Sequence, residues 1–331
     1  MPFHAAGLTR DLQMNKIEFT PRFDFSEIIG RKIIISTSVG PNGEAVVLAV
    51  EKEFEKDPFG RNKQKFGSFP LSKPQRSYPA VFVRCDGKSI RQNELADVEI
   101  AYPFIQPLPD GEILIVAGRC DFRNGNPEQN ALVYGPDGLL RLQFVLGDGI
   151  NGVQTTSDGK IWVGYSDEGV FGNFGWDKPM RAAGLVCFDK YGKKVWDYEP
   201  PKGVGSIADC YAFNVCIDAV WTCYYTDFPL VRIDSHKRIC MWKNDVDGAN
   251  AVAIHGDRIL FWGGYGDQRS RCILQKIKGC ELVLSSELTI TSRSKLCIDG
   301  ASIIGRGSLL HAFSDRTWFT FDLAEVSESA D

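Results

Sequence analysis

The sequence predicts an all-β protein, a six-bladed β-propeller whose ring is closed by its own N-terminal strand. Short runs of Val, Ile, Phe, Tyr and Trp recur between Gly, Asp and Pro turns, and helical periodicity is nearly absent. A strand-turn-strand pattern repeats along the chain, and a strand without a local partner lies near each end. Together these observations favour a closed ring of small antiparallel sheets.

The internal repeat distinguishes a propeller from a β-sandwich. Five rows share an inner strand, a tight turn and a second apolar strand that ends near an Asp. They are YPFIQPLPDGEILIVAGRCD from Tyr102, NGVQTTSDGKIWVGYSD from Asn151, DCYAFNVCIDAVWTCYYTD from Asp209, NAVAIHGDRILFWGGYGD from Asn250 and IDGASIIGRGSLLHAFSD from Ile298. A sixth row, KIIISTSVGPNGEAVVLAVEKE from Lys32, is the most degenerate. Because each row would begin one blade, the six rows predict six blades.

A second hairpin follows every row except the one from Ile298, as in PAVFVRCDGKSIRQ and PLVRIDSHKRICMW, with Gly or Asp at the turn. Each unit therefore has four strands, as one propeller blade does. The last unit ends after the single strand TWFTFDLAEV, and the N-terminal segment KIEFTPRF has no partner. Pairing these two strands would close the ring and protect its edges. Seven blades is the alternative if residues 51–78, where we expect no strands, contain them.

A single domain over residues 1–331 is expected, because repeat architectures grow by adding units. Residues 58–76 form an insertion in the first blade that carries five basic residues, three Phe residues and no acid. We expect a basic loop there, either a solvated segment or a lid or arm for an anionic ligand or partner. We expect residues 325–331 to form a polar tail.

Composition and sequence motifs indicate the cellular compartment and exclude two classes of partner. The formal net charge of -4 argues against a dedicated nucleic-acid binder. The N-terminus lacks an apolar signal region, and no apolar run is long enough to span a membrane. The ten cysteines contain no C-x-x-C, and most lie in apolar strand-like runs, as buried reduced thiols do. We therefore predict a cytoplasmic protein with neither membrane nor nucleic acid as a partner.

Strand direction predicts where a ligand or protein partner would bind. In a propeller the inner strands start on one face, and the loops between second and third strands return to it; we call this the loop-rich face. The long loop YSDEGVFGNFGWDKPM, the turn YYTDFP and the strand DCYAFNV bring aromatics, amides and carboxylates there. The alternative is that the aromatics pack the loops onto their neighbours. The predicted ligand-binding residues are Asp167, Glu168, Asn173, Trp176, Tyr211, Asn214, Tyr225 and Asp227.

The starts of the inner strands suggest a metal site as a further possibility. Asn151, Asp209 and Asp299 open three of these strands, and oxygen ligands suit Ca²⁺. The row NGVQTTSDGKIWVGYSD also resembles repeats of the SMP-30/gluconolactonase and NHL-type propellers. The gluconolactonase resemblance implies a divalent cation held by these three side chains. The first blade departs from that family, because Ile35 and Ser36 stand where an E-G-P motif is expected. The alternative is that these side chains satisfy turn backbones.

No familiar catalytic constellation is present in the sequence. The four histidines are widely separated, and we expect His311 to be packed within a strand. There is no G-x-S-x-G, no P-loop and no dinucleotide fingerprint between a strand and a helix. We therefore predict a propeller that binds a small polar ligand or a protein partner at its loop-rich face, with catalytic residues unknown. The alternative function is a metal-dependent hydrolase of a lactone or ester.

Overall fold

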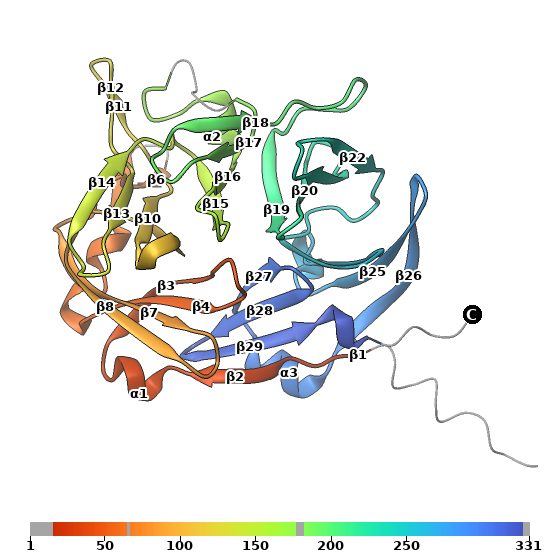
Figure 1. The fold of residues 1–331 in the computed structure, drawn as a ribbon, viewed down its shortest axis with the longest axis horizontal. Coiled ribbons are helices and arrows are strands. Elements are labelled where there is room, and N and C mark those ends of the chain that lie inside the picture. Colours follow the sequence, from red (N-terminus) through yellow and green to blue (C-terminus); the bar gives the residue numbers. More distant parts are fainter. Residues whose placement is uncertain (1–15, 65–66, 177–181, 327–331) are drawn as a thin grey trace, which may run out of the picture.

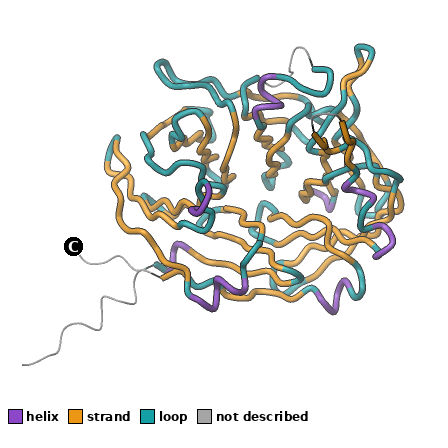
Figure 2. Tube along the Cα trace, turned by 180° about the vertical axis from the view of Figure 1, so that it is seen from behind, coloured by secondary structure: helices purple, strands orange, loops and turns teal. Residues whose placement is uncertain are grey.

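The chain folds as a six-bladed β-propeller, as the sequence predicts (Figure 1). The computed structural model describes residues 16–64, 67–176 and 182–326. The first strands of successive blades contact one another around the axis, and β27 of the last blade contacts β3 of the first. Strands dominate the view from behind, and the helices are short segments in the loops (Figure 2).

The first three blades each contain four antiparallel strands, which follow one another from the axis outward. Blade 1 has β3 (Ile33–Val39), β4 (Ala45–Val50), β7 (Tyr78–Cys85) and β8 (Ile90–Val98). Blade 2 has β9 (Pro103–Pro107), β10 (Ile113–Ala117), β13 (Ala131–Tyr134) and β14 (Leu140–Phe144). Blade 3 has β15 (Ile150–Thr155), β16 (Ile161–Tyr165), β17 (Leu185–Phe188) and β18 (Lys194–Asp197).

The last three blades follow the same order, and the N-terminal segment joins two of them. Blade 4 has β19 (Asp209–Val215), β20 (Ala219–Tyr225), β21 (Leu230–Asp234) and β22 (Ile239–Trp242). Blade 5 has β23 (Ala251–His255), β24 (Arg258–Trp262), β25 (Cys272–Lys278), β26 (Glu281–Ile290) and β1 (Lys16–Ile17). Blade 6 has β27 (Ser302–Arg306), β28 (Leu309–Ser314), β29 (Thr317–Asp322) and β2 (Thr20–Asp24).

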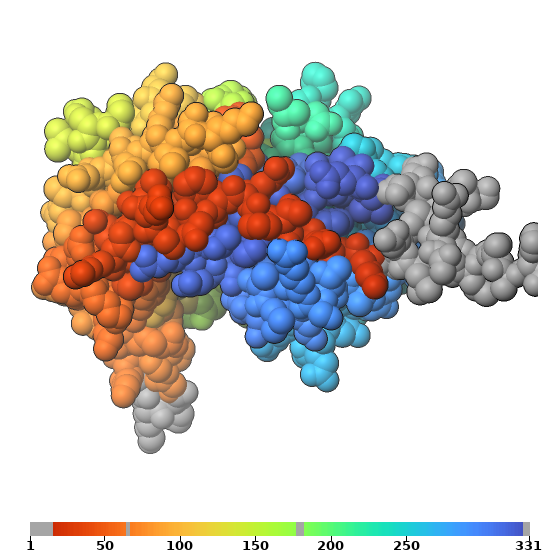
Figure 3. Space-filling view, turned by 90° about the horizontal axis from the view of Figure 1, so that it is seen from below, coloured from red at the N-terminus to blue at the C-terminus, as the bar shows by residue number. Residues whose placement is uncertain are grey.

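The predicted closure by the N-terminal strand is confirmed. Strand β2 pairs antiparallel with β29 as the outermost strand of blade 6, and in Figure 3 it lies (red) against the last blade (dark blue). The sequence did not predict the second link, in which β1 pairs parallel with β26 of blade 5. The segment therefore ties two neighbouring blades together.

The expectation that residues 51–78 contain no strands is wrong. Strands β5 (Arg61–Gln64) and β6 (Gly67–Pro70) form a two-stranded hairpin that projects from the ring (Figure 3, orange). The hairpin adds no blade, because it pairs with no other strand of the described residues. The side chains of Arg61, Asn62 and Lys63 are all exposed, so the alternation of apolar and polar residues that marks a half-buried strand is missing.

Polar side chains of the inner strands fill the centre of the ring and bond across it. Gln106 of β9 donates to Ser38 Oγ of blade 1 at 2.6 Å, and its carbonyl oxygen accepts from Thr155 of blade 3. Arg306 of β27 reaches the opposite blade, where its guanidinium donates to Gln154 Oε1 at 3.0 Å. These bonds satisfy buried polar groups and fix the register of the inner strands.

In the part of the chain that the structure describes, three short α-helices lie in the loops: α1 (Ser26–Ile29), α2 (Asp167–Phe171) and α3 (Ser292–Cys297). Within the described ranges, no helix has the length and apolar character needed to cross a bilayer. All ten cysteines are free, and six of them are buried. His311 is fully buried and stacks on Trp318, which donates to its Nδ1 at 3.1 Å, so it is packed within its strand as predicted.

Candidate functional site

A cavity of about 600 Å³ opens on the loop-rich face where blades 4, 5 and 6 meet. Its polar lining comes from three loops and one strand end, which approach one another only after the ring closes. The inner strand β19 supplies Tyr211, and α3 with the turn after it supplies Lys295 and Asp299. The lining is completed from blade 5 by Asn250, before β23, and by Tyr265 and Arg269, in the loop between β24 and β25.

Three charged side chains of this lining lack a counter-charge. Within the described parts of the chain, Arg269, Lys295 and Asp299 take part in no ion pair, and all three are exposed. Surface charges often point into open solvent without a role. These three instead surround one concave space, where two positive charges and one negative charge face a common volume.

Four aromatic rings pack against one another beside the cavity, and two of them, Tyr211 and Tyr265, line it. We call the four the aromatic cluster: Tyr211, Tyr225, Phe228 and Tyr265. Tyr265 donates to the Tyr211 hydroxyl at 2.8 Å, and the ring centroids of Tyr211 and Phe228 lie 5.4 Å apart. Phe228 is buried, whereas Tyr225 is 48 % and Tyr265 is 50 % exposed. Two tyrosine faces are therefore held in place by packing and remain open to a ligand.

Asp209, the first residue of β19, lies beside the aromatic cluster with an unusual carboxyl group. Its Oδ1 is buried and has no hydrogen-bond partner among the described residues. Burial, and then repulsion by Asp167, raise the pKa of Asp209 to about 6. Its charge in turn helps to raise the pKa of Tyr265, after burial and the Tyr211 hydroxyl. Asp209 therefore forms an acidic edge next to the cavity.

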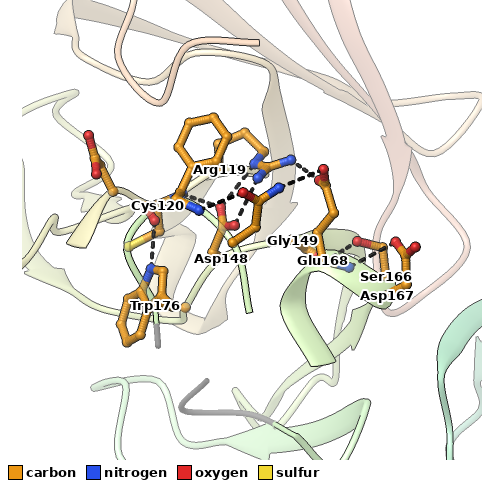
Figure 4. A network of polar contacts seen from close by, with 12 residues as sticks. Arg119, Cys120, Asp148, Gly149, Ser166, Asp167, Glu168 and Trp176 are labelled. Carbon is orange, nitrogen blue, oxygen red and sulfur yellow. Dashed lines mark hydrogen bonds and ion pairs between the residues drawn. The ribbon is translucent and has the colours of Figure 1, made fainter. Parts of the chain in front are cut away.

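Three of the predicted ligand residues hold their own loop in place (Figure 4). Arg119 forms two bonds to buried Asp148, of 3.0 and 2.9 Å, and pairs with Glu168 through its third nitrogen. Glu168 also accepts from Asn173 at 2.9 Å. Trp176 is buried and donates to the Cys120 carbonyl at 2.7 Å (Figure 4). Their polar groups are engaged within the protein, which agrees with the packing alternative for this loop.

The other predicted ligand residues are separated by the fold. Tyr211 lines the cavity, and Tyr225 belongs to the aromatic cluster. Asp167 and Asp227 are exposed on the same face. Asn214 lies elsewhere: it is fully buried in the centre of the ring, where its amide donates to the Val252 and Gly307 carbonyls at 2.8 and 2.9 Å.

The three residues of the predicted metal site come from blades 3, 4 and 6. Asn151 donates to the Cys210 carbonyl at 2.8 Å, a backbone group of the inner strand β19 in the neighbouring blade and not of its own turn. Asp209 has the buried free oxygen, and Asp299 lines the cavity. In the described ranges, no group of three or more His, Cys, Asp or Glu side chains is placed to hold a metal ion.

Sequence reasoning missed Asn250, Tyr265, Arg269 and Lys295. Tyr265 and Arg269 lie in GGYGDQRSR, which follows the second strand of blade 5 and is therefore placed on the loop-rich face by the blade pattern. That signal was available. No sequence signal pointed to Lys295. It lies on α3, a helix in the connection between two blades, and the position of α3 depends on its bonds to the N-terminal segment.

Comparison with known proteins gives one family match and a set of distant structural similarities. The model of the YxzG family matches residues 179–269, which is less than half of the chain. None of the curated proteins matches the sequence.

Several solved structures share the general architecture. A streptogramin B lyase is 13% identical, with a TM-score of 0.48, over 93% of this chain and 98% of its own. Virginiamycin B lyase from Staphylococcus aureus is 13% identical, with a TM-score of 0.47, over 92% and 99% of the two chains. A gluconolactonase from Xanthomonas campestris is 7% identical, with a TM-score of 0.40, over 84% and 89%. Similarity at this level carries no argument about activity.

Proposed function

We propose that this propeller binds a small polar molecule in the cavity between blades 4, 5 and 6, and that this molecule carries both an anionic group and an amine or hydroxyl group. The observation that supports the proposal is that three charges, Arg269, Lys295 and Asp299, surround one space of about 600 Å³ and form no ion pair with any described residue. Small-molecule sites in proteins have volumes of roughly 300–1,000 Å³ and a few convergent polar groups.

The positions of the charges suggest how such a molecule would be oriented. Arg269 and Lys295 suit a carboxylate or phosphate group, because charge-assisted hydrogen bonds are among the strongest in proteins. Asp299 and the acidic edge at Asp209 suit an amine or hydroxyl group. The open face of Tyr265, which lines the cavity, suits the apolar part of the same molecule.

The test compares two basic residues of helix α3. Lys295 lines the cavity, whereas Arg293, two positions earlier, is exposed and does not. A panel of small amino acids, hydroxy acids and sugar acids is screened by thermal shift, and any ligand found is titrated by calorimetry. We expect Lys295→Met to weaken its binding about tenfold, and Arg293→Met to leave it unchanged. Equal effects of the two substitutions, or no ligand in the panel, would count against the site.

The metal-dependent hydrolase is the second candidate, favoured by the buried oxygen of Asp209, which has no hydrogen-bond partner among the described residues. A cation bound there by Asp209, Asp299 and Asn151 would polarise the carbonyl group of a lactone or ester. The same calorimetric experiment includes a calcium arm with the wild-type chain and Asp209→Asn. Saturable calcium binding that this substitution removes would support the metal function, and no binding at millimolar calcium would exclude a calcium site of ordinary affinity.

A further inference from the structure

A second cavity, of about 350 Å³, lies on the face opposite the loop-rich face. It is lined by the turns between first and second strands of blades 1, 3 and 4 and by the β21–β22 turn of blade 4. Arg306, at the end of the inner strand of blade 6, also borders it. No part of the proposed function uses this space.

Arg306 is a buried positive charge that forms no ion pair with any described residue. It is 5% exposed, and its guanidinium donates to two neutral acceptors, Gln154 Oε1 and the Thr155 carbonyl. Within the described ranges it forms no ion pair; the nearby Glu44 carboxylate is already engaged by Arg84 at 2.6 Å. A charge that is taken out of water without a partner of opposite sign is costly, so a group that supplies that sign should bind favourably.

Lys237 brings a second unpaired positive charge to the same cavity. It lies in the turn after β21 with a φ of 65°, a conformation that is costly for a residue with a Cβ. The Asp234 carboxylate holds this turn by accepting from the backbone N–H groups of His236 and Arg238 at 2.9 Å each. The Lys237 ammonium is 4.2 Å from the centre of the Trp162 ring, and no described residue forms an ion pair with it.

The acidic residues of this lining are neutralised locally. Asp158 pairs with Lys160, Asp234 pairs with Arg238, and Asp218 lies 3.8 Å from Arg232. The uncompensated charge of the cavity is therefore positive. Burial lowers the pKa of Lys237 and lowers that of Arg306 to about 10, as expected for cations that have lost part of their hydration.

We propose that this cavity is an anion site that binds a small molecule through a carboxylate or phosphate group, held between Arg306 and Lys237. The hydroxyl groups of Ser157 and Ser235, which also line the cavity, would donate further hydrogen bonds to its oxygens. Arg306 would then gain a counter-charge that none of the described residues provides through an ion pair. The site is independent of the proposed function, since the two cavities lie on opposite faces of the ring.

Calorimetric titration with inorganic phosphate and with citrate tests the proposal, at constant ionic strength set with sodium chloride. We expect saturable binding of at least one anion, and the stronger of the two identifies a phosphate or a carboxylate ligand. Lys237→Met and Arg306→Met should each weaken binding about tenfold. Lys193→Met, an exposed lysine in the β17–β18 turn outside the cavity, should leave binding unchanged.

Two outcomes would overturn the proposal. One is the absence of saturable binding of either anion up to about 10 mM. The other is binding that Lys237→Met leaves intact and Lys295→Met removes, which would assign the anion to the cavity on the loop-rich face. If Arg306→Met fails to fold, Lys237→Met still decides, because its side chain lies in a surface turn and bonds to no inner strand of the described residues.

Discussion

At the scale of single residues, Asp209 is a partly buried carboxylate in an environment that disfavours its charge. Its buried oxygen has no partner among the described residues, and repulsion from Asp167 adds to the cost of ionising it. Groups of this kind are concentrated at functional sites, where stability is given up for a reactive or ligand-ready arrangement. The pH dependence of stability should reveal this cost.

The folded-state pKa of Asp209, about 6, lies above the ordinary value of 3.8. The protonated form is thus favoured by folding, and its contribution to stability, present below the ordinary pKa, is lost as the pH rises through about 6. We expect Asp209→Asn, which resembles the protonated acid, to raise the free energy of unfolding at pH 7 by about 1 kcal/mol, a value reduced for solvent screening. Near pH 4 it should change little.

Urea unfolding at the two pH values measures this difference. Asp227→Asn is the control, because it neutralises an exposed carboxylate on the same face, and it should alter stability at neither pH. The same gain for Asp209→Asn at both pH values would show that the raised pKa does not affect folding.

At the scale of elements, the N-terminal segment both closes the ring and supports the candidate site. The backbone N–H of Phe19 donates to Ser294 Oγ of α3 at 2.9 Å, and the Thr291 N–H donates to the Ile17 carbonyl at 3.0 Å. These bonds fix the helix that carries Lys295. The Phe19 ring is 4% exposed and packs on Trp262 with centroids 5.6 Å apart.

Phe19→Ala should therefore lower the free energy of unfolding by about 3–5 kcal/mol, as large-to-small changes in a packed core do. Urea unfolding measures it, with Glu18→Ala at the adjacent exposed position as a control that changes stability by less than about 0.5 kcal/mol. If the two substitutions had similar small effects, the N-terminal segment would not contribute to closure in solution.

At the scale of the whole molecule, bonds through the centre join blades that are distant in sequence. A linear repeat protein is stabilised by contacts between neighbours only. In this ring, Arg306 joins blade 6 to blade 3, and Asn214 joins blade 4 to blades 5 and 6. The ring is therefore expected to unfold as one unit.

Asn214→Ala tests both this role and its assignment to a ligand site. Removing the amide takes away the Asn214 partner of the buried Val252 carbonyl and of the Gly307 N–H, so we expect a loss of about 1–3 kcal/mol of stability. Ligand binding at the loop-rich face should not change. Asn126→Ala, an exposed asparagine in the β11–β12 hairpin (Phe122–Arg123 and Asn126–Pro127), is the control. If Asn214→Ala weakened ligand binding and left the free energy of unfolding unchanged, Asn214 would belong to the ligand site after all.

The predicted ligand site was only partly assembled by the fold, and Glu168 shows why. Its loop is rich in polar and aromatic residues, which is typical of a binding loop, but Arg119 from another loop pairs with Glu168 and is itself held by Asp148. No local pattern reports such a contact. The β5–β6 hairpin was not predicted because its sequence lacks the alternation of apolar and polar residues that marks a half-buried strand.

The sequence by itself determined the blade pattern, the four-strand unit and the closing strand at the N-terminus. These depend on period-two alternation and on turn residues, which are local and repeat with each blade. Only the tertiary structure decided which charges remain unpaired and which cavities they surround. Ring closure brings together loops and strand ends of different blades. It therefore places Arg269, Lys295 and Asp299 around one cavity and Lys237 and Arg306 around the other.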